Sequence, residues 1–209
     1  AKDISSLRIV QTAFKIICFI GGIHTTVIGY ENIPKDKPVL FIGNHRGFFD
    51  TIISYSMMPG ITGFVAKKEI EKVPLLRVWM RYLHCLFLDR ANIKEGLKTI
   101  LKGIDEVKAG VSMVIFPEGT RNKGDGIMPF KEGSFKIAEK SGCLIIPMVQ
   151  NNTSAAFEDH FPFIRRTHTI IEFGTPIDLT TLSKEDRKAI GAYTHSIMLK
   201  MYEKNQSLV

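Results

Sequence analysis

Short apolar runs recur along the chain and alternate with longer segments whose apolar residues lie three or four positions apart. The short runs predict buried strands, and the longer segments predict helices that bury one face. Strands are expected at residues 25–28, 38–42, 61–66, 85–88, 112–116, 143–146 and 169–173, and Pro147 predicts a strand end or a bulge. Helices are expected at residues 4–23, 74–82 and 93–108, in segments ending near Met58 and Lys140, and after Ser183. This alternation predicts a single α/β domain.

The first helix, residues 4–23, is apolar over most of its surface, and its polar residues Arg8, Gln11, Thr12 and Lys15 form one narrow stripe. Lys15 leaves only residues 16–20 uninterrupted before Gly21, whereas a bilayer crossing takes about 20 apolar residues. Two interpretations remain: the helix lies in a membrane interface, or it packs on the domain. We expect the interface, because so wide an apolar surface exceeds one packed face. The chain then divides into an amphipathic membrane-interface helix (residues 1–24) and a globular domain (residues 25–209).

One turn places a histidine and a carboxylate between two apolar runs. Residues 44–50 read Asn-His-Arg-Gly-Phe-Phe-Asp, between a predicted strand and a predicted helix. Imidazole titrates near pH ~6.5, so His45 can accept a proton and Asp50 can orient its ring. Five residues of helix would set the two side chains roughly 140° apart, so His45 is expected in the turn. The alternative is that both residues only cap the helix, where Asp is favoured.

A second polar loop follows the strand predicted at residues 112–116. Residues 117–126 are rich in Gly and charge, and they include Arg121. Glycine lets backbone N–H groups approach an anion, and a guanidinium has the planar geometry that suits phosphate. A lone arginine in such a loop is most often solvated. Here two strand ends each carry a polar cluster, and ligand sites of open α/β sheets collect at strand ends.

Four blocks of the sequence resemble, in order, the motifs of the glycerophospholipid acyltransferases typified by 1-acylglycerol-3-phosphate acyltransferase. Residues 44–50 are similar to the family's His-x4-Asp motif, and residues 67–69 with Pro74 and residues 87–90 resemble its second block. Residues 116–121, Phe-Pro-Glu-Gly-Thr-Arg, resemble the third block, and residues 145–149 the fourth. The resemblance covers about residues 38–150, and its third block is the most specific.

The resemblance implies a mixed β-sheet with helices on both faces and an N-terminal helical extension. It implies acyl transfer from an acyl thioester to the free hydroxyl of lysophosphatidic acid, giving phosphatidic acid, with glycerol 3-phosphate or another lysolipid as alternative acceptors. Acyl-coenzyme A or an acyl carrier protein would be the co-substrate, and no cofactor is expected. The expected partners are the lysophospholipid, the thioester and an anionic membrane surface. The expected location is the cytoplasmic face of the cell membrane, as a peripheral or monotopic protein.

The same resemblance assigns roles to single residues. It implies that His45 is the general base and that Asp50 orients it. It implies substrate binding by Lys67, Arg90, Glu118, Gly119, Thr120 and Arg121, with oxyanion donors near Gly119. Without the resemblance, Lys67 at a strand end would face water, and Asp89 with Arg90 could equally form a structural ion pair.

Three positions depart from the family pattern and leave the choice of acceptor open. Gly47 stands where the family often has serine, and Arg77 and His84 stand where it usually has glycine. His84 and Asp89 repeat the His-x4-Asp spacing, but they fall on opposite faces of a predicted strand and cannot cooperate locally.

The composition limits which classes of molecule the protein is expected to bind. The chain has 209 residues, a net charge of +7 and a pI near 9.3, which favours anionic partners. The basic residues are scattered and no nucleic-acid module is visible, so nucleic acid is not expected. Cys18, Cys85 and Cys143 lie far apart, each in an apolar run. This pattern is typical of buried free thiols in a reducing compartment. The six histidines show no metal-ligand spacing, so no metal is expected.

Two other classes of function compete with acyl transfer. A hydrolase would use a serine nucleophile, but the sequence contains no G-x-S-x-G elbow. A non-catalytic lipid-binding module would keep the basic residues but would not need His45.

Overall fold

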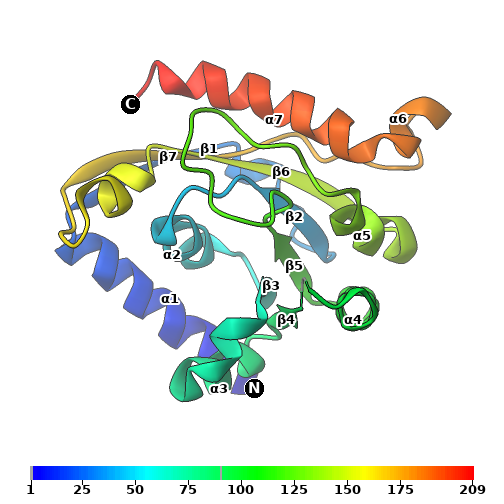
Figure 1. Ribbon diagram of the computed structural model, residues 1–209, viewed down its shortest axis with the longest axis horizontal. Coiled ribbons are helices and arrows are strands. Elements are labelled where there is room, and N and C mark those ends of the chain that lie inside the picture. Colours follow the sequence, from blue (N-terminus) through cyan, green and yellow to red (C-terminus); the bar gives the residue numbers. More distant parts are fainter. Residues whose placement is uncertain (1, 90) are drawn as a thin grey trace.

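Seven strands form one sheet in the computed structural model, which describes residues 2–89 and 91–209 (Figure 1). The strands are β1 (Ile23–Ile28), β2 (Val39–Gly43), β3 (Thr62–Lys67), β4 (Leu86–Leu88), β5 (Ser112–Ile115), β6 (Leu144–Asn151) and β7 (Thr167–Phe173). Their order is β1-β7-β6-β2-β5-β3-β4, in which β6 and β7 are antiparallel and the other pairs are parallel. The predicted mixed α/β sheet is confirmed. Since β2 to β6 all run one way, their carboxyl ends lie at one edge.

Helices cover both faces of this sheet (Figure 1). On one face lie α1 (Lys2–Ile20) and α2 (Phe48–Met57), and α3 (Pro74–Tyr82) contacts α1. On the other face lie α4 (Ile93–Lys108), α5 (Lys136–Ser141) and α7 (Ile190–Gln206), which the short α6 (Lys184–Lys188) precedes.

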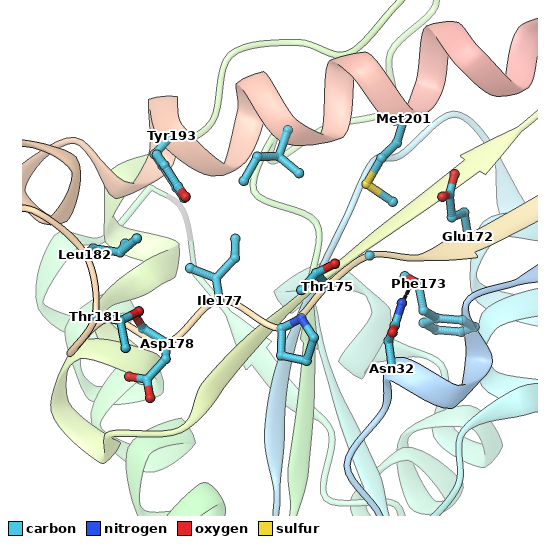
Figure 2. Close-up of a pocket in the computed structure, with 13 residues that line it drawn as sticks. Asn32, Glu172, Phe173, Thr175, Ile177, Asp178, Thr181, Leu182, Tyr193 and Met201 are labelled. Atoms are coloured by element: carbon cyan, nitrogen blue, oxygen red, sulfur yellow. Dashed lines mark hydrogen bonds between the residues drawn. The ribbon is translucent and has the colours of Figure 1, made fainter.

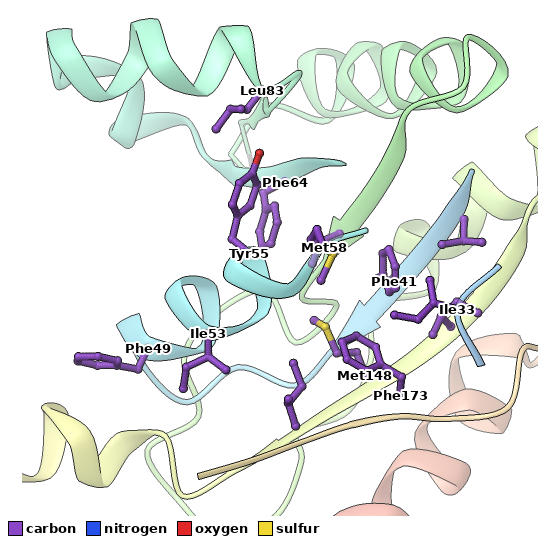
Figure 3. Close-up of a cluster of buried hydrophobic side chains, with 14 of the residues drawn as sticks. Ile33, Phe41, Phe49, Ile53, Tyr55, Met58, Phe64, Leu83, Met148 and Phe173 are labelled. Atoms are coloured by element: carbon purple, nitrogen blue, oxygen red, sulfur yellow. The ribbon is translucent and has the colours of Figure 1, made fainter. Parts of the chain in front are cut away.

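Alternate residues of the central strand β2 enter two separate cores. Val39 and Phe41 belong to the core under α1 and α2, whereas Leu40 and Ile42 belong to the core under α4, α5 and α7. Successive side chains of a strand point to opposite faces, so a strand covered on both faces reads as one apolar run. In the first core, aromatic and aliphatic side chains from α2, β2, β3, β6 and β7 pack together (Figure 3).

Pro147 does not end its strand, so the predicted strand end was wrong. β6 continues to Asn151, and Pro147 pairs with Ile42 of β2. The carbonyl of Pro147 accepts the N–H of Gly174 at 2.8 Å, and the nitrogen of a strand residue points the same way as its carbonyl. The missing N–H therefore faces the point where the β6–β7 ladder stops, and the pairing with β2 is intact.

The last helical segment differs from the sequence pattern, which predicts one helix with Ile190, Tyr193, Ile197 and Met201 buried. Ser183 caps the segment as predicted, by accepting the N–H of Asp186 at 3.0 Å, but α6 ends at Lys188 before α7 begins. The buried residues of α7 are Ile190, Gly191, Thr194, Met198, Tyr202 and Asn205. Ile190 is buried as predicted, and Tyr193, Ile197 and Met201 are partly buried and pack against the core under α4, α5 and α7. Asn205 is also buried and donates to Glu172 of β7 at 2.7 Å, so a polar residue occupies a core position.

α1 packs on the domain by one face and exposes apolar residues on the other. Leu7 is buried in the first core, and Val10, Phe14 and Cys18 pack against it. Gln11, which belongs to the polar stripe of the sequence pattern, faces the domain and donates to the carbonyls of Tyr55 (3.2 Å) and Met58 (2.8 Å). The boundary predicted after residue 24 falls inside β1. None of the helices in residues 2–89 and 91–209 has the apolar length that a bilayer crossing requires.

Leu7→Ala is expected to lower the free energy of unfolding by about 2–5 kcal/mol, because it opens a cavity between α1 and the sheet. Urea unfolding followed by circular dichroism measures the change. Ile20→Ala is the matched control: its side chain is 78% exposed, so its effect should stay within about 0.5 kcal/mol. Equally small effects of both substitutions would contradict the packing of α1.

Candidate active site

The turn that carries His45 follows β2 directly. Asn44 is buried, its Nδ2 donates to the carbonyl of Gln150 (2.8 Å), and its Oδ1 accepts the N–H of Gln150 (2.7 Å). This side chain extends the hydrogen bonding between β2 and β6 by one residue and fixes the chain just before His45. α2 begins only at Phe48, so His45 lies in the turn, as predicted.

His45 and Asp50 are in direct contact. Nδ1 of His45 lies 2.7 Å from Oδ2 of Asp50, and the same oxygen accepts the N–H groups of Arg46 (2.6 Å) and Gly47 (2.7 Å). Oδ1 accepts the hydroxyl of Thr153. Asp50 is fully buried in the first turn of α2, where the helix dipole favours a negative charge. It therefore caps the helix and orients the histidine at the same time.

One nitrogen of the His45 ring is free to act. A carboxylate only accepts hydrogen bonds, so Nδ1 carries the proton and Nε2 carries the lone pair. Nε2 has no hydrogen-bond partner among the residues that the structure describes, and the side chain is 20% exposed. The ring stacks on Phe116 with centroids 4.4 Å apart and planes 14° apart. An imidazole held in this way can take a proton from a hydroxyl group.

The loop after β5 holds the main chain of His45. Oε1 of Glu118 accepts the N–H of His45 (2.6 Å), Oε2 accepts the N–H of Met128 (2.9 Å), and Asn122 donates to the carbonyl of His45 (2.7 Å). Burial raises the pKa of Glu118, and the two N–H donors oppose that rise. Glu118 therefore holds the main chain of His45 in place, and its direct contact with substrate stays a prediction.

Gly119 and Thr120 form the tip of the same loop. Gly119 adopts φ +77, a left-handed conformation that favours glycine, and its N–H donates to the carbonyl of Phe116 at 3.1 Å. The amide of Gly119 is thus engaged, and an oxyanion donor would have to be another N–H nearby. Thr120 is exposed. The ammonium of Lys131 lies over the loop, 2.7 Å from where a Cβ of residue 119 would be. Lys131 lies outside the four motif blocks, so no feature of the sequence predicted a cation here.

Arg121 lies beside the start of α2. Its guanidinium carbon is 3.8 Å from the centroid of the Phe48 ring, and Nη1 is 3.7 Å from Oε1 of Glu158. Phe48 is the first residue of α2, in the same turn as His45. The base and the guanidinium therefore meet at one edge of the sheet, as the sequence predicts. Thr153 and Glu158 were missed, because residues 150–166 show no regular pattern in the sequence and lie outside the motifs, which favours a surface loop or an interfacial loop.

Other predicted substrate contacts lie farther along this edge or outside the described residues. Lys67 ends β3, which β5 separates from β2, and its Nζ lies 3.2 Å from Oε1 of Glu69. Arg90 lies outside the described residues. Asp89 pairs with Lys68 at 2.8 Å.

The two bulky departures from the family pattern differ in position. His84 precedes β4, at the end of the strands opposite to His45, and its Nδ1 lies 2.8 Å from Glu106, as expected if His84 and Asp89 do not cooperate. It adopts φ 57, the left-handed conformation that a glycine would take there. Arg77 lies within α3.

A cavity of about 430 Å³ is not part of this site (Figure 2). It is lined by residues that include Asn32, Phe173 and Met201. β7 runs against β6, so Phe173 at its carboxyl end lies at the edge opposite to His45.

Metal and thiol chemistry gain no support from the side chains. No group of three or more His, Cys, Asp or Glu that could hold a metal occurs in residues 2–89 and 91–209. Cys18, Cys85 and Cys143 are free, and burial raises the pKa of each thiol, that of Cys85 to about 12. A thiol with a raised pKa is a poor nucleophile at neutral pH.

The mixed sheet carries a His–Asp pair at the carboxyl edge of its parallel strands, an arrangement that suits proton transfer from a hydroxyl group. A family model described as Acyltransferase matches residues 24–151, and the chain belongs to this family. It is therefore an O-acyltransferase.

Several relatives are named 1-acyl-sn-glycerol-3-phosphate acyltransferase. That of Borreliella burgdorferi is 29% identical over 95% of this chain and 79% of its own length. That of Haemophilus influenzae is 32% identical over 81% and 72%. The relative of Saccharomyces cerevisiae is 31% identical over 87% of this chain, which spans only 60% of that protein. The crystal structure of the 1-acyl-sn-glycerophosphate (LPA) acyltransferase from Thermotoga maritima shares the fold, with a TM-score of 0.81, 23% identity and coverage of 95% and 79%.

His45→Ala is expected to lower kcat by at least about two orders of magnitude, because it removes the base. Asp50→Asn should lower kcat less, because it removes the orienting contact and the charge that stabilises the imidazolium but leaves the base. Release of free thiol from an acyl thioester measures kcat, and the circular dichroism spectrum of each variant controls for folding. Wild-type turnover in a folded His45→Ala variant would exclude this mechanism.

Proposed function

We propose that this protein acylates the free hydroxyl of lysophosphatidic acid to give phosphatidic acid, with an acyl thioester as donor. The observation that carries the proposal is the His45–Asp50 contact of 2.7 Å, which leaves Nε2 of His45 open at the edge where Arg121 lies. The names of the relatives support the acceptor, and glycerol 3-phosphate or another lysolipid is the alternative.

The chemical step is direct transfer. Nε2 of His45 takes the hydroxyl proton while the hydroxyl oxygen attacks the thioester carbonyl. The carbon–sulfur bond then breaks, and the departing thiolate takes the proton back from the imidazolium. Asp50 stabilises the transient positive charge on the ring through the Nδ1 hydrogen bond. No acyl-enzyme and no cofactor is needed, because the donor brings the activated acyl group.

Arg121 is the proposed contact for the acceptor's phosphate. Its side chain is 40% exposed, and its guanidinium lies over the Phe48 ring, so a planar group that suits phosphate is both held in place and accessible. Lys67 and Arg90 are proposed as further cationic contacts, and Glu118, Gly119 and Thr120 shape the loop between Arg121 and His45.

Arg121→Ala is expected to lower kcat/KM for lysophosphatidic acid roughly 10–150-fold, the worth of one charge-assisted hydrogen bond of about 1.5–3 kcal/mol. The KM for the thioester should change little. Initial rates with each substrate varied in turn measure both values. A loss confined to the thioester would assign Arg121 to donor binding.

A panel of substrates tests the reaction as a whole. The purified protein is given acyl-coenzyme A or acyl carrier protein loaded with the same chain, and lysophosphatidic acid, glycerol 3-phosphate or another lysolipid as acceptor. We expect phosphatidic acid as the main product. Absence of ester product from every acceptor, or the same products from the His45→Ala variant, would contradict the proposal.

We also propose that the protein binds the cytoplasmic face of the cell membrane as a peripheral protein. The exposed face of α1 ends beside the loop at residues 161–166: Ile164 lies 3.1 Å from a Cβ built on Gly21, and the N–H of Thr167 donates to the carbonyl of Gly22. Together they form one apolar surface, here termed the apolar rim, made of Ile16, Phe19, Ile20, Phe161, Phe163 and Ile164, all exposed. Lys15, Arg165 and Arg166 are also exposed beside it and suit an anionic leaflet. Three free thiols suit a reducing compartment.

Phe19→Ser combined with Phe163→Ser is expected to weaken binding to anionic liposomes by at least about tenfold. Moving each aromatic side chain from water into lipid is favourable by about 1.5–3 kcal/mol, and serine loses this free energy. Liposome sedimentation measures binding. Ile93→Ser, at the start of α4, is the matched control, since Ile93 is 89% exposed but lies on the opposite side of the sheet. An equal loss in the control, or no loss in the double variant, would contradict the apolar rim.

A further inference from the structure

Glu158 occupies the place where an anion would meet both Arg121 and the start of α2. It begins the short helix η5 (Glu158–His160), in the loop after β6. Its Oε1 accepts the N–H of Phe48 at 2.8 Å and lies 3.7 Å from Nη1 of Arg121. Phe48 is the first residue of α2, a helix of ten residues, where exposed N–H groups and the helix dipole attract negative charge.

The contact between Glu158 and Arg121 is loose. A separation of 3.7 Å is longer than a hydrogen bond and far from the bidentate geometry that a guanidinium and a carboxylate can form. The second oxygen, Oε2, is buried and has no hydrogen-bond partner among the described residues. A buried carboxylate oxygen without a donor is unfavourable, so this arrangement is poised for exchange.

Gly47 makes room for the carboxylate. Its φ of −157 and ψ of −176 are extended values that any residue adopts, so the backbone does not require glycine. A Cβ at this position would lie 2.7 Å from Cδ of Glu158 and closer still to Oε2. A side chain at residue 47 and the carboxylate of Glu158 therefore exclude each other, which gives a physical reason for glycine where the family often has serine.

We propose that the Glu158 carboxylate fills the phosphate subsite of the acceptor until that phosphate displaces it, so that Glu158 sets the apparent affinity for the acceptor. The inference rests on the proposed role of Arg121. Phosphate and carboxylate use the same donors, and a phosphate offers more oxygens to a guanidinium. The subsite thereby favours acceptors whose phosphate can displace the Glu158 carboxylate. Neutral acceptors do not bind there, so removing the charge of Glu158 should not change their affinity.

Glu158→Gln removes the competing charge but keeps an oxygen that can accept the N–H of Phe48. The KM for lysophosphatidic acid is expected to fall about five- to tenfold. This is the size of effect expected when one unit charge is removed a few ångströms away at a partly exposed site. The kcat should stay within about twofold of the wild-type value. The rate with a monoacylglycerol should not change. Asp159→Asn is the matched control, because Asp159 is the next residue of the same loop and contacts Ser154 instead (2.9 Å).

Gly47→Ser gives a second route to the same result, since its side chain pushes the carboxylate out of the subsite. It should lower the KM for lysophosphatidic acid in the same direction, and the double variant should show no further decrease. A rise in KM in Glu158→Gln would overturn the proposal, since Glu158 would then support acceptor binding. An unchanged KM with a lower Tm would also overturn the proposal, because Glu158 would then only cap the start of α2.

Arg121→Ala separates this inference from the function on which it rests. If Arg121→Ala raises the KM for lysophosphatidic acid while Glu158→Gln leaves it unchanged, only the displacement of Glu158 is wrong. If Arg121→Ala leaves that KM unchanged, the phosphate contact itself is wrong, and the inference falls with it.

Discussion

Four hydrogen-bond donors converge on the buried carboxylate of Asp50: the His45 ring, two N–H groups of the turn and the hydroxyl of Thr153. A buried charge without partners would be strongly destabilising, so these contacts must form together. They join the end of β2, the first turn of α2 and the segment after β6. The position of the histidine therefore depends on the same carboxylate that starts the helix, and catalytic geometry and folding are coupled at this point.

The direction of the strands decides which loops reach His45. β2 and β5 are parallel neighbours, so the loop after β5 arrives beside the turn after β2. That loop supplies Glu118 and Asn122 to the main chain of His45 and brings Arg121 over Phe48. β7 reverses the direction, which puts its carboxyl end and the cavity of about 430 Å³ at the opposite edge. The His45 site and the cavity therefore lie at opposite edges of the sheet.

α1 packs against the core on one side and exposes apolar residues on the other. Leu7 joins the core and Gln11 satisfies the last carbonyls of α2, while Phe19 and Ile20 stay exposed beside the loop at residues 161–166. Glu158, in η5 just before this loop, lies 3.7 Å from Arg121. Glu158 therefore lies only a few residues before Phe161, Phe163 and Ile164, the part of the apolar rim that does not belong to α1.

The sequence by itself determined the alternation of strands and helices, the place of His45 in a turn, and the two polar loops at strand ends. These features follow from local periodicity, from turn residues and from motif spacing, all of which lie within a few neighbouring positions. Only the tertiary structure decided that Thr153, 103 residues away, completes the Asp50 site, that Glu118 holds the base, and that Glu158 reaches Arg121. It also decided that Pro147 lies within β6, because the missing N–H faces the point where the β6–β7 ladder stops, and that Asn205 lies in the core, because Glu172 of β7 accepts its side-chain N–H.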